Sequence, residues 1–149
     1  MRLTSLTDYS MRLMMYLDQH PERLCTIAEV ASYHGISEAH LMKITHLLAK
    51  GEWIITQRGK NGGMKLAKPS THINLGKLIR YMESDLAVVE CLGTQTQCVL
   101  SGQCRLTGIL NQALQHFLQH LDQYTLADLL PPRCQSAMGE QSVFLLPKQ

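Results

Sequence analysis

Apolar positions in the first 51 residues recur every three or four places, which predicts short helices with one buried face. The first of these stripes covers residues 7–19, where methionine and leucine recur at helical spacing. Thr7 or Asp8 is the expected N-cap, because a short polar side chain can accept a hydrogen bond from an unpaired backbone N–H group. We therefore expect a helix close to the start of the chain.

Two further helices are predicted from their start and stop signals. Thr26 and Glu29 have the spacing of a capping box, and Gly35 is a suitable terminator for the short helix between them. Ser37 is the expected cap of a third helix, whose stripe of leucine and isoleucine stops before Gly51.

Two β-rich runs follow, at residues 53–57 and 64–66, and a turn containing Asn61 and Gly62 separates them. We expect a β-hairpin here. Three short helices followed by a hairpin are the element order of a winged helix-turn-helix, in which the third helix enters the major groove and the hairpin is the wing. The predicted fold class is mainly α, with this small wing.

The second half of the chain carries one more short helical pattern and then a long one. The long apolar stripe starts after residue 104 and continues for more than four turns. A stripe of this length in a small protein favours a partner helix, so we expect a dimerisation helix and a homodimer. The predicted division is a winged helix-turn-helix at 1–80, a connector and ligand loop at 81–104, the dimerisation helix at 105–130 and a tail at 131–149.

Composition and charge narrow the possible partners. Apolar residues make up 45% of the chain and charged residues 17%, as in folded globular proteins. The net charge is only +2, but the segment from Lys43 to Lys68 holds six basic residues and a single acid, Glu52. One face is therefore expected to contact phosphate groups.

No apolar run reaches the roughly 18 residues of a membrane span, and no export signal is recognisable, so we expect a cytoplasmic protein without membrane contact.

Three of the five cysteines, Cys91, Cys98 and Cys104, lie in one short Gly-containing loop. An odd cysteine count without an export signal favours reduced thiols over a disulfide framework. The loop has no C-x2-C pair of the kind that most structural zinc sites use, whereas iron–sulfur clusters are larger and accept wider spacing. An iron–sulfur cluster is thus favoured over zinc, and three unliganded thiols are the alternative. Cys25 is expected to pack in the core, and Cys134 to be a surplus thiol of the tail.

The segments "LTDYSMRLMMYL", "ISEAHLMKITHLLAKGEWIITQRGKNGGMKLAKP" and "LDQYTLADLL", with the three loop cysteines, resemble the iron–sulfur winged-helix regulators of the Rrf2 family. The resemblance covers about residues 1–130 and is greatest to the family's nitric-oxide-sensing repressors. It implies that Cys91, Cys98 and Cys104 hold the cluster, with 4Fe-4S favoured and 2Fe-2S as the alternative.

The resemblance also suggests the fourth ligand. Nitric-oxide-sensing members use a carboxylate from the first helix of the partner subunit, and Asp8 matches it; an ordinary helix cap is the alternative role. Arg12 lies one turn later and can support Asp8. Members that sense cluster supply carry a histidine three residues after the third cysteine, where this chain has Thr107.

The expected DNA contacts lie on the third helix and at the wing tip: Ser37, Glu38, His40, Lys43, Arg58, Lys60 and Asn61. Relatives often carry a basic residue at the position of Glu38, so the operator sequence is expected to differ from theirs. The resemblance and dimer symmetry imply an AT-rich inverted repeat of double-stranded DNA.

Together these features predict a non-enzymatic transcriptional repressor that senses nitric oxide, in which nitrosylation or loss of the cluster releases operator DNA. One alternative is a related regulator that senses cluster supply or redox state. A cluster-carrying redox protein is less favoured, because no nucleotide-binding or catalytic motif is recognisable. A zinc-containing or metal-free winged helix that binds protein is the remaining rival.

Overall fold

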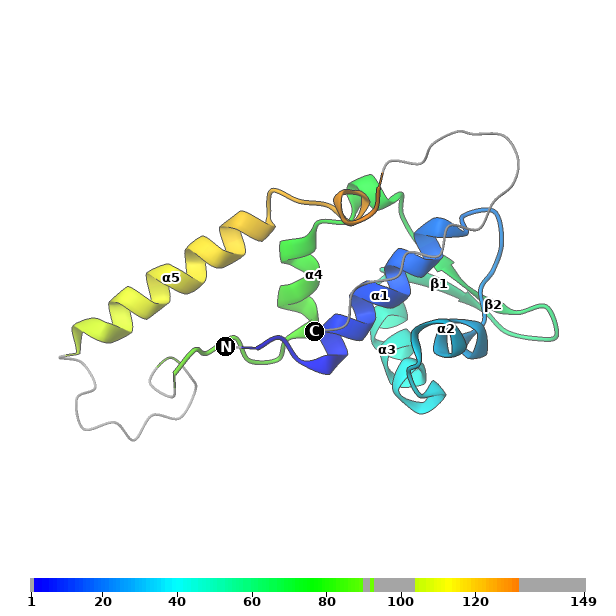
Figure 1. The fold of residues 1–149 in the computed structure, drawn as a ribbon, viewed down its shortest axis with the longest axis horizontal. Helices are drawn as coiled ribbons and strands as arrows, with labels where there is room; N and C mark the ends of the chain where they lie inside the picture. The colour runs from blue at the N-terminus through cyan, green and yellow to red at the C-terminus, as the bar shows by residue number, and fades with distance from the viewer. Residues whose placement is uncertain (1, 90–91, 93–103, 132–149) are drawn as a thin grey trace.

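The computed structural model describes residues 2–89, Leu92 and residues 104–131. Figure 1 shows a winged-helix body from which one long helix projects. The element order is α1 (Ser5–Gln19), α2 (Ile27–His34), α3 (Glu38–Lys50), β1 (Ile54–Gln57), β2 (Gly63–Leu66), η1 (Ser70–His72), α4 (Leu75–Met82), α5 (Arg105–Leu121) and η3 (Leu126–Leu129). The mainly helical fold with a two-stranded wing confirms the predicted fold class.

A single apolar core holds the winged helix together. Leu13 and Met14 of α1, Leu41 of α3 and Met64 of β2 are all almost completely buried within it. Burying side chains of this size removes roughly 1.5–3 kcal/mol of unfavourable hydration each. Cys25 is also buried, as its isolated position in the sequence predicts. The core thus fixes the orientation of α3 against α1.

The first helix begins earlier than its sequence pattern predicts. Its N-cap is Thr4, whose hydroxyl accepts a hydrogen bond from the Thr7 N–H, so neither Thr7 nor Asp8 is the cap. The prediction was wrong because the favoured cap depends on a distant partner. The buried Glu83, at the end of α4, accepts hydrogen bonds from the Thr4 N–H at 2.7 Å and from its hydroxyl at 3.1 Å. Asp8 therefore lies inside the first turn of α1.

The ends of α2 and the start of α3 agree with the local signals. Thr26 and Glu29 form a complete capping box, and Gly35 ends α2 with a φ of 65°. That left-handed backbone is accessible to glycine at little cost. The Ser37 hydroxyl accepts from the His40 N–H at 3.3 Å and caps α3.

The wing is a regular antiparallel hairpin. Ile54 pairs with Leu66 and Gln57 pairs with Gly63. Cys25, in the segment before α2, adds an isolated bridge to Met64 through two backbone hydrogen bonds of 2.8 and 3.0 Å. Strand β2 is thereby fastened to the segment that precedes α2, while the turn at residues 58–62 extends beyond this contact.

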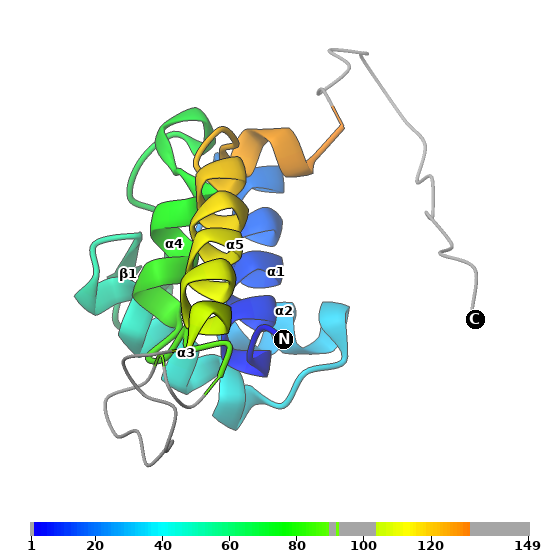
Figure 2. The same ribbon diagram turned by 90° about the vertical axis from the view of Figure 1, so that its left-hand side faces the viewer.

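The long helix α5 contacts the body mainly near its C-terminal end. Of its residues only Leu118 is buried, whereas Leu106 and Ile109 are 56% and 61% exposed. The chain then returns to the body: Leu126 of η3 is completely buried in the winged-helix core. Figure 2 shows α5 in front of α1, with α4 beside it. The N-terminal part of the α5 apolar stripe, around Leu106 and Ile109, is thus left exposed in a single subunit.

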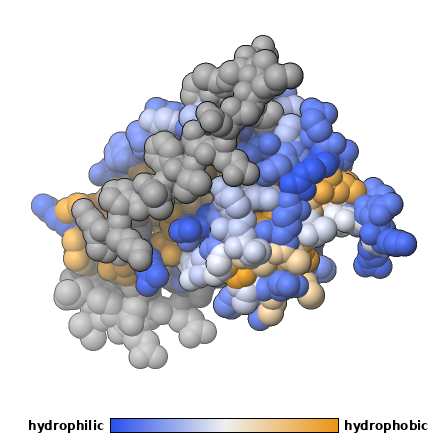
Figure 3. All heavy atoms as spheres, turned by 45° about the vertical axis from the view of Figure 1, so that its right-hand side comes forward, coloured by the Kyte–Doolittle hydropathy of each residue, from blue (hydrophilic) through white to orange (hydrophobic). Residues whose placement is uncertain are grey.

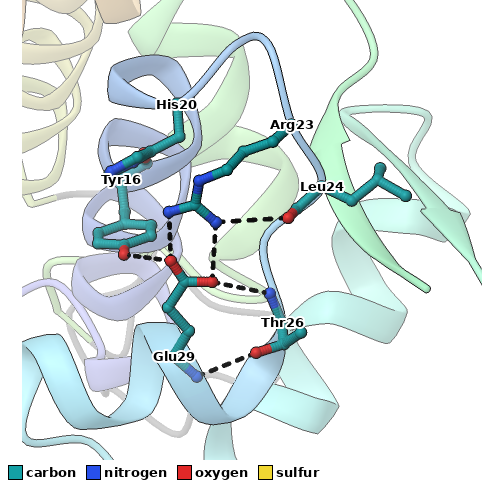
Figure 4. A network of polar contacts seen from close by, with 6 residues as sticks. All are labelled: Tyr16, His20, Arg23, Leu24, Thr26 and Glu29. Atoms are coloured by element: carbon teal, nitrogen blue, oxygen red, sulfur yellow. Dashed lines mark hydrogen bonds and ion pairs between the residues drawn. The ribbon is translucent and has the colours of Figure 1, made fainter. Parts of the chain in front are cut away.

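A polar network joins α1, α2 and the segment between them (Figure 4). Glu29 is its centre: its carboxylate accepts from the Tyr16 hydroxyl at 2.7 Å and from both terminal nitrogens of Arg23. The Arg23 guanidinium is the main cause that lowers the Glu29 pKa to about 2, and the hydrogen bond from Tyr16 adds to it. This network fixes the N-terminus of α2, the helix that precedes α3.

Glu29→Gln is expected to lower the free energy of unfolding, and the size of this loss should depend on pH. Because the folded-state pKa lies below the ordinary value of 4.5, the carboxylate stabilises the fold above about pH 4.5 and loses this contribution as pH falls through about 2. The wild-type advantage in unfolding free energy should therefore be full at pH 5.5 and much smaller at pH 2.5. Urea unfolding at both pH values measures it, and a constant difference would contradict the assignment.

Candidate functional site

The exposed side of α3 carries the residues that sequence patterns assign to DNA. Ser37, Glu38, His40 and Lys43 are all exposed, whereas Leu41 and its neighbours on the opposite side are buried. The hydroxyl of Ser37 is engaged in capping α3. The remaining three side chains project from the first two turns, which is the part of a recognition helix that meets base edges.

One exposed residue on this face escaped the sequence-based prediction. Met42 lies between His40 and Lys43 and is 60% exposed. Its position one residue after Leu41 is compatible with the solvent side of α3, but methionine is so common in cores that the sequence alone does not identify it as exposed. An exposed apolar side chain on a recognition helix is suited to the methyl group of thymine.

The wing tip presents the second group of predicted contacts. Arg58, Lys60 and Asn61 are all exposed in the connection between β1 and β2. Gly59 between them has a φ of 110°, which strongly favours glycine. In Figure 3 the protruding hairpin end, at the right, is hydrophilic. A narrow basic projection of this kind can reach a minor groove or the phosphates beside it.

Asp8 presents a carboxylate at the first turn of α1. Its two oxygens lie 3.2 and 3.1 Å from Nε of Arg12, one turn later, and both side chains are about half exposed. Glu83 fixes the cap of the same helix through Thr4. The carboxylate is therefore held in position but keeps exposed surface for a further ligand.

Cys104 is the N-cap residue of α5 and is half-buried. The backbone N–H groups of Thr107 and Leu106 hold the pKa of its thiol below the ordinary value. A stabilised thiolate is the form that binds iron. Cys91 and Cys98, the other two predicted ligands, lie outside the described residues, as does Cys134.

The donor chemistry at Cys104 and Asp8 fits an iron–sulfur cluster, but the two residues do not meet within one subunit. Figure 1 places the N-terminal end of α5 well away from the first turn of α1. Among residues 2–89, 92 and 104–131, no three His, Cys, Asp or Glu side chains form a group that could hold a metal ion. A site using both residues requires a second subunit.

The model of the Rrf2 family, described as an iron-dependent transcriptional regulator, matches residues 3–132. The chain belongs to the Rrf2 family. Two curated relatives are each 46% identical over 132 residues, and both are named HTH-type transcriptional regulator NsrR. The protein from Shouchella clausii matches over 87% of this chain and 89% of its own length, and that from Halalkalibacterium halodurans over 87% and 90%.

Solved structures agree with the family assignment. The structure of T. potens IscR superposes with a TM-score of 0.70 at 25% identity, covering 93% of this Rrf2 chain and 94% of that one. The chain is therefore a transcriptional regulator with the winged-helix fold of its family. In the part of the chain that the structure describes, no helix is long and apolar enough to cross a membrane.

Proposed function

We propose that this Rrf2 chain is a homodimeric transcriptional repressor that binds operator DNA when it carries an iron–sulfur cluster and releases it in response to nitric oxide. The observation that carries the proposal is that one fold presents an exposed face of α3 beside a basic wing tip and, far apart within one subunit, an exposed carboxylate at Asp8 and a thiol at Cys104. In the proposal these two groups become cluster ligands in a dimer. The 46% identity to regulators named NsrR and the resemblance to nitric-oxide-sensing members support the same function.

In this proposal Cys91, Cys98 and Cys104 of one subunit bind the cluster, and Asp8 of the other subunit supplies the fourth ligand. The 4Fe-4S form is favoured and 2Fe-2S is the alternative. The cluster supplies iron that reacts with nitric oxide. Arg12 orients the Asp8 carboxylate, and the backbone N–H groups at the start of α5 stabilise the Cys104 thiolate.

The DNA-binding surface combines α3 with the wing. His40, Lys43 and Glu38 lie where they can meet base edges and phosphates, and Met42 extends this set as an apolar contact. Ser37 holds the N-terminus of α3, whose backbone N–H groups attract phosphate. Arg58, Lys60 and Asn61 contact the backbone or the minor groove from the wing tip. Two such surfaces in a dimer would recognise an inverted repeat.

Operator binding by cluster-loaded and cluster-free protein tests the proposal. Protein purified without oxygen should contain iron and acid-labile sulfide, and it should bind an AT-rich inverted repeat from its own promoter in a salt-dependent manner. Addition of nitric oxide is expected to weaken this binding about 100-fold. Equal affinity of the two forms, or a colourless protein containing zinc, would contradict the proposal. Release by oxidants but not by nitric oxide would instead favour the sensing of redox state or cluster supply.

A further inference from the structure

The two ends of α5 have different attachments. Its N-cap is Cys104, a proposed cluster ligand, and its C-cap is Asp122, which contacts α4. The helix has 17 residues, a length of about 25 Å at 1.5 Å per residue. Since Leu118 is its only buried residue, α5 meets the winged helix chiefly near Asp122. A displacement of α5 at its Cys104 end is therefore transmitted to the DNA-binding domain of the same subunit through the contacts at Asp122.

The attachment is an ion pair with two parallel hydrogen bonds. Nη1 of Arg80 donates to Oδ1 of Asp122 at 2.6 Å, and Nη2 donates to Oδ2 at 2.8 Å. Two parallel hydrogen bonds fix the relative orientation of the two side chains as well as the distance between them. Arg80 is the main cause that holds the Asp122 pKa below its ordinary value. The pair thus holds Asp122, at the C-terminal end of α5, against α4.

The surroundings of Asp122 reinforce this geometry. Nδ2 of Asn74 donates to the Asp122 backbone carbonyl at 2.7 Å. Gly76 lies directly beneath the Asp122 carboxylate, where a Cβ atom would collide with Oδ1, so glycine allows the close approach. Two backbone hydrogen bonds join the segment after Asp122 to the start of α4. The Leu75 N–H donates to the Tyr124 carbonyl at 3.0 Å, and the Leu126 N–H donates to the Ile73 carbonyl at 2.8 Å.

The helix α4 also reaches the second proposed ligand. Its C-cap residue Glu83 holds Thr4, the cap of α1, whose first turn carries Asp8. Leu78 and Ile79 of α4 are buried between these contacts. One short helix is therefore fastened to α5 at one side and to the start of α1 at its end.

We propose that the Arg80–Asp122 ion pair is a positioning contact that transmits the state of the cluster site from α5 to the DNA-binding domain. This inference rests on the proposed function. Both side chains are more than one-third exposed, at 37% and 38%, so the pair contributes little to overall stability. Its role is to keep α5 and the winged helix at one fixed angle, so that the spacing of the two recognition helices follows the cluster site.

The test is a double-mutant cycle with Arg80→Ala, Asp122→Ala and the double variant. The quantity measured is the ratio of the operator Kd of cluster-free protein to that of cluster-loaded protein. Each single variant is expected to reduce this ratio about tenfold, and the double variant no further than either. Glu22→Ala, which removes an exposed charge from the segment before α2 and away from Asp122, is the control and should leave the ratio unchanged.

A second measurement, which does not depend on the cluster, accompanies the double-mutant cycle. Backbone hydrogen exchange at residues 122–128 of the cluster-free protein is expected to rise in Asp122→Ala, while exchange in the α1–α3 core stays the same. An unchanged Kd ratio in both single variants would overturn the positioning role, even if exchange rises. If the wild type itself shows no difference between loaded and cluster-free protein, the proposed function fails rather than the role of this pair.

Discussion

Asp8→Ala is expected to shorten the lifetime of the iron–sulfur cluster about 100-fold. Loss of residues that merely support metal ligands typically costs 10–100-fold in metal affinity, and loss of a ligand itself belongs at the upper end. The fold should survive, since an exposed ion pair such as Asp8–Arg12 contributes at most about 1 kcal/mol. Decay of the cluster absorbance near 400 nm under a chelator measures the lifetime. Arg12→Ala, which removes the ion pair but keeps the carboxylate, should shorten it by a smaller factor of about tenfold, the lower end of this range.

Mixed dimers can show which subunit supplies the carboxylate. A heterodimer of one Asp8→Ala subunit and one Cys104→Ala subunit contains one intact carboxylate and one intact set of cysteines, on different chains. If Asp8 binds the cluster of its partner, these intact residues meet and one long-lived cluster forms per dimer. If Asp8 acts within its own chain, neither site is complete and no long-lived cluster forms, which would contradict the proposed arrangement.

Replacing the two basic side chains of the wing tip, Arg58→Ala with Lys60→Ala, is expected to weaken operator binding at least about 100-fold. Each phosphate contact contributes about 0.9 to the slope of log K against log salt, and every contact occurs twice in a dimer. The slope should therefore fall by about 3.6 if both side chains contact phosphate, and by about 1.8 if one of them does. Fluorescence anisotropy between 50 and 200 mM salt, with cluster-loaded protein, measures both quantities.

Two further variants separate a specific contact from a general charge effect. Arg58→Lys keeps the charge but loses the planar fork of donors, so it should keep the salt slope and lose affinity mainly for the preferred operator. Lys77→Ala removes a positive charge from α4, away from the reading surface, and should leave both affinity and slope near the wild type. A wing variant that behaves like Lys77→Ala would contradict DNA contact by the wing.

The elements with strong local signals could be predicted from the sequence. The capping box of Thr26 and Glu29 and the cap Ser37 are found where their spacing places them, since each involves residues three positions apart. The hairpin was found within one residue of its expected strands. The exposed wing residues Arg58 and Lys60 follow from the hairpin turn itself, because a two-stranded ribbon cannot bury its tip.

Contacts between distant segments could not be predicted in this way. Thr4 replaces Thr7 and Asp8 as the cap of α1 because Glu83, 79 residues away, holds it. Arg80 and Asp122 are 42 residues apart, and nothing in either local pattern indicates that they meet. The exposure of Met42 depends on which face of α3 the core occupies.

The order of amino acids alone determined the periodic and capping patterns of this chain, its basic wing and its three clustered cysteines, because these features involve neighbours along the backbone. The packing of α4 against both α1 and α5 decided where Asp8 and Cys104 lie relative to each other, and that the N-terminal part of the α5 apolar stripe is left exposed. The physical reason is that the free energy of these contacts arises only when remote side chains are brought together by a common core.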